Sequence, residues 1–169
     1  MKQHNRPGVY QIVLTACLTA LLKAVKTALA AIPGVEAVTL LVILYTQVLG
    51  WQTGLTAVFL MTGINCLIYG FDSWVIEYLY IWPLLVFLAW KIKGRNTVGQ
   101  AVLAGMFGLF SGTLCMPVTF LFYGGRSGAL AWWLAGLSTD IIHGISNFIV
   151  TLLLYRPLYK ALDVTAHRY

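Results

Sequence analysis

Long apolar segments, separated by short breaks of glycine, proline or charged residues, make up most of the chain. About 20 apolar residues suffice for a helix to cross the hydrocarbon core of a bilayer, and most of these segments approach that length. We therefore predict six helices at about 10–31, 36–49, 52–69, 75–92, 97–122 and 130–155. Because the breaks are short, neighbouring helices should be antiparallel. The predicted fold is an all-α integral membrane protein, a compact bundle forming one domain over 1–169.

The second segment, 36–49, differs from the others in length. Its roughly 14 residues are marginal for a full crossing of the hydrocarbon core. We predict a short helix that packs inside the bundle.

Composition supports a membrane protein and excludes most soluble classes. Hydrophobic residues make up 60% of the chain and charged residues 9%, with a mean hydropathy of +0.83; an average soluble domain is about 25% charged. Six spans in 169 residues leave no room for an ATPase or a nucleotide-binding domain. The three cysteines, Cys17, Cys66 and Cys115, each lie in an apolar run. This placement favours buried free thiols over disulfides or a metal site.

The net charge of +6 would suggest a nucleic-acid partner in a soluble protein, but in a membrane protein it indicates orientation. With the N-terminus in the cytoplasm, eight of the eleven lysines and arginines fall on the inner side, and the outer loops contain only Arg126. The eight are Lys2, Arg6, Lys91, Lys93, Arg95, Arg156, Lys160 and Arg168. We predict that both termini are cytoplasmic (N-in and C-in) and that no nucleic acid is bound.

The first predicted helix carries small residues at four-residue spacing, Ala16, Ala20 and Ala24. Such a stripe lets another helix approach closely, either from the same bundle or from a partner subunit.

Two lysines, Lys23 and Lys26, lie three residues apart on the outer half of this helix. A charged side chain at the bilayer centre costs about 2.5–3.5 kcal/mol on insertion scales, so such residues usually face a cavity or a partner. Snorkelling to the outer interface is the alternative.

The last predicted helix carries polar groups along one face. Its residues at three- or four-residue intervals are Trp133, Gly136, Asp140, His143, Gly144, Asn147 and Thr151. That face should point away from lipid. Asp140 and His143 are close enough to hydrogen-bond, and the face is either a polar clamp between helices or part of a ligand site. Enzymatic activity is not expected, because no nucleophile, metal set or second histidine has a recognisable spacing.

Polar and aromatic residues also gather at the outer ends of the third and fourth predicted helices. The aromatic residues are typical either of an interface belt or of the walls of a ligand pocket. The candidate substrate-binding residues from these helices and the last one are Asn65, Trp74, Glu77, Tyr78, Trp132, Trp133, Asp140, His143 and Asn147.

Taken together, the short-looped six-helix pattern, the alanine stripe and the segments 32–39 and 136–148 resemble a known family. The family is that of the substrate-binding S components of energy-coupling factor transporters. The resemblance implies that the chain captures a water-soluble vitamin or vitamin precursor at the outer face of a prokaryotic plasma membrane, without a cofactor. It implies a pocket between helices four, five and six under the first, third and fifth loops. It also implies docking of Ala16, Ala20 and Ala24 on a scaffold membrane subunit, with two ATPase subunits completing the transporter.

Two other functions fit the sequence. One is a self-sufficient secondary carrier or proton-linked channel that uses Asp140 and His143 as a relay. No internal repeat is evident, which argues against a carrier built from inverted repeats. The other is a membrane subunit that binds partners and transports nothing.

Overall fold

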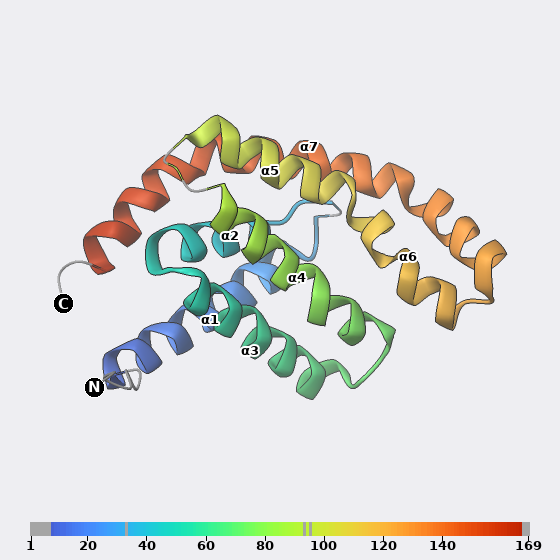
Figure 1. The fold of residues 1–169 in the computed structure, drawn as a ribbon, viewed down its shortest axis with the longest axis horizontal. Helices are drawn as coiled ribbons and strands as arrows, with labels where there is room; N and C mark the ends of the chain where they lie inside the picture. The colour runs from blue at the N-terminus through green and yellow to red at the C-terminus, as the bar shows by residue number, and fades with distance from the viewer. Residues whose placement is uncertain (1–7, 33, 93, 95, 167–169) are drawn as a thin grey trace.

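The computed structural model describes residues 8–32, 34–92, 94 and 96–166, and all regular secondary structure in these ranges is helical. The helices are α1 (Val9–Leu29), α2 (Val38–Leu49), α3 (Trp51–Tyr69), α4 (Ser73–Lys91), α5 (Thr97–Leu109), α6 (Ser111–Phe122) and α7 (Gly125–Ala166) (Figure 1). The all-α prediction is therefore confirmed for the described part of the chain. Pro33, Lys2, Arg6, Lys93, Arg95 and Arg168, which entered the sequence interpretation, lie outside the described residues.

Five segments are long and apolar enough to cross a membrane: α1, α3, α4, the combined segment 97–122, and α7. They indicate a multi-pass membrane protein. The observed bounds of α1, α3 and α4 differ from the predicted ones by at most two residues at each end.

The short helix α2 lies at the centre of the bundle, as its length predicted. Nine of its 12 residues, 38–46, are buried, and it contacts α1, α3, α4, α5 and α7. At 1.5 Å per residue it is about 18 Å long, less than the roughly 30 Å of the hydrocarbon core. A helix that is apolar on every side is stable only when it is surrounded by other helices, and this explains its position.

The fifth predicted helix, 97–122, is interrupted. Phe110 leaves the helical conformation, with φ −97° and ψ 7°, and separates α5 from α6. The Asp140 carboxylate of α7 accepts hydrogen bonds from the Gly112 backbone N–H at 3.1 and 3.2 Å and from the Ser111 hydroxyl at 2.8 Å. Asp140 thus satisfies backbone groups that a helix start leaves unpaired.

The sixth predicted helix, 130–155, is longer at both ends, since α7 contains 42 residues. The predicted outer loop is reduced to Tyr123 and Gly124. The glycines in this segment have different roles. Gly124 and Gly125 have positive φ values of 87° and 71° and form the turn. Gly128 lies inside α7, where only glycine fits, because a Cβ there would lie 1.5 Å from the Tyr123 carbonyl oxygen. Arg126 is consequently in the first turn of α7.

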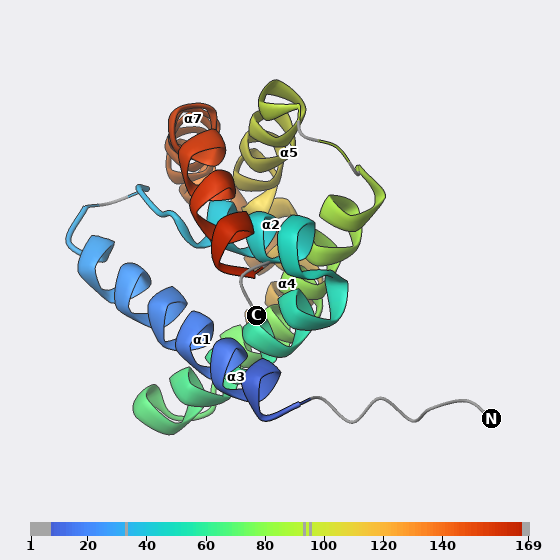
Figure 2. The same cartoon turned by 90° about the vertical axis from the view of Figure 1, so that its left-hand side faces the viewer.

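Two of the connections lie on the opposite side of the molecule from the start of α1 and the end of α7. In Figure 1, α1 begins and α7 ends on the left, and the α3–α4 and α6–α7 turns are on the right. In Figure 2, α1 lies to one side of the bundle and only its connection to α2 extends towards α7. Among the described helices α1 packs on α2 and α3. The connection therefore bridges a space between α1 and α7.

Candidate functional site

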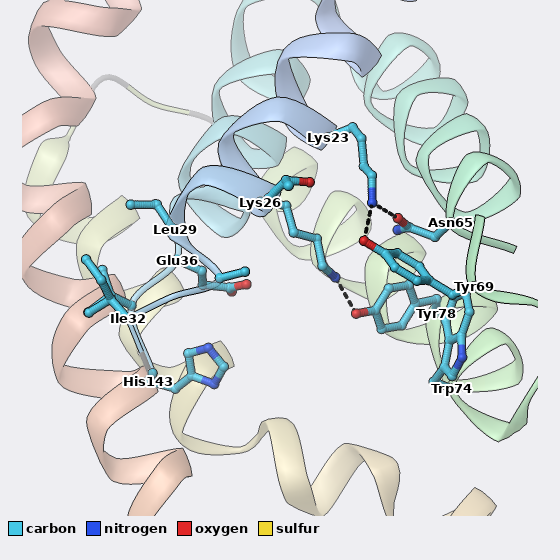
Figure 3. Close-up of a pocket in the computed structure, with 14 residues that line it drawn as sticks. Lys23, Lys26, Leu29, Ile32, Glu36, Asn65, Tyr69, Trp74, Tyr78 and His143 are labelled. Atoms are coloured by element: carbon cyan, nitrogen blue, oxygen red, sulfur yellow. Dashed lines mark hydrogen bonds between the residues drawn. The ribbon is translucent and has the colours of Figure 1, made fainter. Parts of the chain in front are cut away.

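A cavity of about 470 Å³ occupies this space between α1, the α1–α2 connection, α3, α4 and α7 (Figure 3). Apolar atoms form most of its wall, and nine polar or aromatic side chains contribute to it. They are Lys23, Lys26, Thr27, Glu36, Asn65, Tyr69, Trp74, Tyr78 and His143. Ligand pockets in proteins have this character, with volumes of about 300–1,000 Å³ and a few orienting polar groups.

α1 contributes both lysines to the cavity. The Lys23 ammonium donates to Asn65 Oδ1 at 2.7 Å and to the Tyr69 hydroxyl at 3.1 Å, and Lys26 donates to the Tyr78 hydroxyl. Each ammonium also lies 4.4 Å from the ring centroid of its tyrosine, a cation–π distance. The sequence left open whether the two lysines face a cavity, face a partner or extend to the outer interface. In the structure both line a cavity.

The opposite wall is aromatic and is built at the junction of α3 and α4. The Asp72 side chain accepts a hydrogen bond from the Ser73 N–H and caps the start of α4. Trp74 and Tyr78 follow one helical turn apart, with ring centroids 5.3 Å apart in an edge-to-face arrangement. Tyr69, at the end of α3, completes the wall.

The α1–α2 connection covers the cavity from the side of α7. Gly34 has a φ of 74° and lies so close to α7 that a Cβ would be 2.4 Å from Ile142 Cγ2. Two residues later, Glu36 Oε1 accepts from the Thr39 hydroxyl at 2.7 Å and from Asn147 Nδ2 at 3.4 Å. The connection is therefore held to α7 at two points.

Two further polar groups line the cavity. Asn65 is only 2% exposed, and its Nδ2 has no hydrogen-bond partner among the described residues. His143 is partly buried, and in Figure 3 its imidazole extends from α7 towards Glu36.

The structure brings together four of the nine predicted substrate-binding residues: Asn65, Trp74, Tyr78 and His143 all line the cavity. Asn147, 2% exposed, lies behind it and contacts it through Glu36.

The other four predicted residues lie away from this cavity. Trp132 is 39% exposed, and Trp133 Nε1 donates to the Thr113 hydroxyl at 3.0 Å. Glu77 is buried where α4 meets Cys115 of α6. The sequence put Asp140 within hydrogen-bonding reach of His143, but the partners of its carboxylate in the structure are Ser111 and Gly112 at the start of α6.

The cavity also differs in place from the pocket that the resemblance implies between helices four, five and six. α1 and α3 form much of its wall, and among the described residues none from α5 or α6 lines it. Tyr69 and Glu36 are lining residues that were not among the predicted ones. Their signal in the sequence is a polar group next to a helix end. Glu36 stands at the start of the second apolar segment, ten residues after Lys26, and Tyr69 stands at the end of the third, four residues after Asn65.

No protein-family model, curated protein or solved structure matches the chain. The candidate site therefore rests on its own geometry, which combines two cations, one carboxylate, an amide, an imidazole and an aromatic wall. These groups are suited to holding a small polar molecule by hydrogen bonds and stacking.

The predicted docking residues lie on an uncovered side of α1. Ala16, Ala20 and Ala24 are all exposed, so the stripe is not used to pack the bundle. Cys17, on the same helix, is exposed as well. The prediction of buried thiols is therefore wrong for Cys17, because no described helix covers this side of α1, and Cys66 and Cys115 are only partly buried.

Proposed function

We propose that this chain is the substrate-binding S component of an energy-coupling factor type transporter. It captures a water-soluble vitamin or vitamin precursor at the outer face of a prokaryotic plasma membrane. A scaffold membrane subunit and two ATPase subunits then drive the uptake. In this proposal the chain is not an enzyme.

The observation that carries the proposal is the cavity itself. A volume of about 470 Å³ suits a vitamin-sized molecule, and its lining combines hydrogen-bonding groups with aromatic walls inside an otherwise apolar bundle. Such polar groups are costly within a membrane and commonly mark a substrate site.

The exposed alanine stripe supports the proposed partner. Close helix packing in membranes is favoured by small residues at four-residue spacing, and Ala16, Ala20 and Ala24 offer that spacing without a covering helix. We propose that the scaffold subunit packs on this stripe.

Charge placement supports the proposed N-in and C-in orientation. Lys91 ends α4, while Arg156 and Lys160 lie in the last part of α7; Arg126 lies in its first turn. Under the positive-inside rule the end with more cations is cytoplasmic, which directs the connection between α1 and α2, and the cavity below it, outward.

The partner test uses the affinity-tagged chain in its native membrane. Mass spectrometry of the purified complex should identify one scaffold membrane protein and two ATPases. Ala20→Leu should lose all three because a larger side chain prevents close approach on the stripe, whereas Ala135→Leu, at an exposed alanine of α7, should keep them. Purification of wild type without any ATPase would contradict the proposal.

A proton-linked carrier is the competing function, and it makes the opposite prediction. Vesicles containing only this chain would then accumulate substrate when a pH gradient is imposed, without ATP. In the structure the Asp140 carboxylate is engaged by Ser111 and Gly112, which does not favour the proposed relay.

A further inference from the structure

The cavity contains more positive charge than its own residues neutralise. Lys23 and Lys26 contribute two cations, and Glu36 is the one carboxylate in the lining. Both lysines donate to neutral amide or phenol oxygens, and within the described residues no carboxylate pairs with them. The Glu36 carboxylate, for its part, is bound by Thr39 and Asn147.

Unused hydrogen-bond donors accompany this charge. An ammonium carries three N–H donors; Lys23 uses two of them and Lys26 uses one, so three remain. The Nδ2 of buried Asn65 adds a further donor without a partner among the described residues. A buried donor left unpaired is unfavourable, so a ligand rich in acceptors fits this wall.

The two lysines are also neighbours on α1. Residues three apart face each other on the helix surface, where like charges repel. An anionic group between them removes this repulsion and makes charge-assisted hydrogen bonds to both.

We propose that the ligand is a small, water-soluble molecule with a carboxylate or phosphate group on a planar ring. Its anionic oxygens lie between Lys23 and Lys26 and accept from Asn65, and its ring lies against Trp74 and Tyr78. The inference rests on the proposed function of capturing a small solute, and it adds the charge and shape of that solute.

The far end of the ligand meets a different environment. Glu36 and His143 line the cavity from the α1–α2 connection and from α7. A second anionic group there would be repelled by the Glu36 carboxylate, whereas a hydroxyl or amine could donate to it. The cavity therefore fits a ligand with one anionic end and one hydrogen-bond-donating end.

Thermal unfolding of the purified chain in a neutral detergent tests the charge of the ligand. The probes are sodium benzoate and phenyl phosphate, compared with uncharged benzamide at equal ionic strength. The two anions should raise Tm by roughly 3 °C at several times their Kd, and benzamide should raise it much less. Equal shifts for benzoate and benzamide, or no shift with either anion, would overturn the inference from wild type alone.

Lysine variants then locate the bound anion. Lys23→Gln and Lys26→Gln should each weaken benzoate binding by about tenfold or more. Lys23→Arg keeps the positive charge and should retain most of the affinity for benzoate. Lys91→Gln, at the exposed end of α4, is the matched control and should bind as wild type does. Unchanged binding in both cavity variants would place the anion elsewhere and overturn the assignment.

An anionic lipid headgroup has the same chemistry, so a second arm separates the two sources. Nanodiscs of phosphatidylcholine alone are compared with nanodiscs that also contain phosphatidylglycerol. If phosphatidylglycerol abolishes the benzoate shift in wild type, the site holds a headgroup and the small-molecule proposal fails. The scaffold recovery described above does not depend on ligand charge, so failure of this inference is distinguishable from failure of the proposed function.

Discussion

At the scale of single residues, the cavity depends on a place where the backbone of one segment lies too close to a neighbouring helix for any side chain to fit. Gly34 is the clearest case, because it combines a positive φ of 74° with a contact to Ile142 of α7. The contact is with the branched end of Ile142, whose Cβ would be 3.0 Å from an added methyl group. A rotamer change alone therefore does not make room, and the α1–α2 connection would have to move.

We predict that Gly34→Ala weakens binding of benzoate, as followed by its shift in Tm. Gly50→Ala is the control, since Gly50 also has a positive φ, of 96°, but nothing lies within 4 Å of an added Cβ. The free energy of unfolding should fall by about 1–2 kcal/mol in both variants, because alanine disfavours the positive φ. Only Gly34→Ala should also bind benzoate more weakly. Equal affinity in the two variants would show that the contact with α7 does not hold the cavity closed.

At the scale of helices, the break between α5 and α6 depends on a residue far away in the sequence. Phe110 has no obvious helix-breaking character, and the carboxylate that binds the start of α6 comes from Asp140. A contact over 28 residues of sequence is not encoded in local periodicity, and the prediction of one continuous helix over 97–122 failed for this reason.

We predict that Gly112→Ala destabilises the protein by about 1–3 kcal/mol, because a Cβ would lie 2.3 Å from Asp140 Oδ2 and the carboxylate would lose its backbone partner. Gly136→Ala, in α7 with nothing within 4 Å of an added Cβ, should be neutral or slightly stabilising, since alanine favours helix. Urea unfolding in detergent, followed by circular dichroism, compares the two. Similar stabilities would mean that Asp140 does not anchor the break.

The local sequence pattern was sufficient to predict an element when the prediction depended on that segment alone. The segment 36–49 predicted a short, internal helix from its length alone, because about 14 residues are marginal for a full crossing. This argument needs no knowledge of its neighbours. Lys23 and Lys26 show the limit. Helical spacing placed them together, but whether they meet a cavity, lipid headgroups or a partner depends on how α1 packs on α2 and α3. This packing is fixed by contacts over long sequence distances.

At the scale of the whole molecule, the proposed orientation can be tested because the α6–α7 turn and the end of α7 lie on opposite sides. We predict that a cysteine introduced at Ser127 is labelled by a membrane-impermeant maleimide in intact cells. A cysteine at Lys160 should be labelled only after the membrane is permeabilised. Both are made in a variant without the three native cysteines. Labelling in the reverse order would invert the proposed topology and place the cavity at the cytoplasmic side.

Finally, α1 places Lys23 and Lys26 in the cavity and exposes the alanine stripe on another side of the same helix. A ligand and a docked scaffold subunit would therefore act on one helix, whose backbone packs on α2 and α3. If docking changes the tilt of α1 and so the affinity for the ligand, thermodynamic linkage requires the ligand to change the affinity for the scaffold by the same factor. The scaffold could then distinguish a loaded subunit from an empty one without touching the ligand.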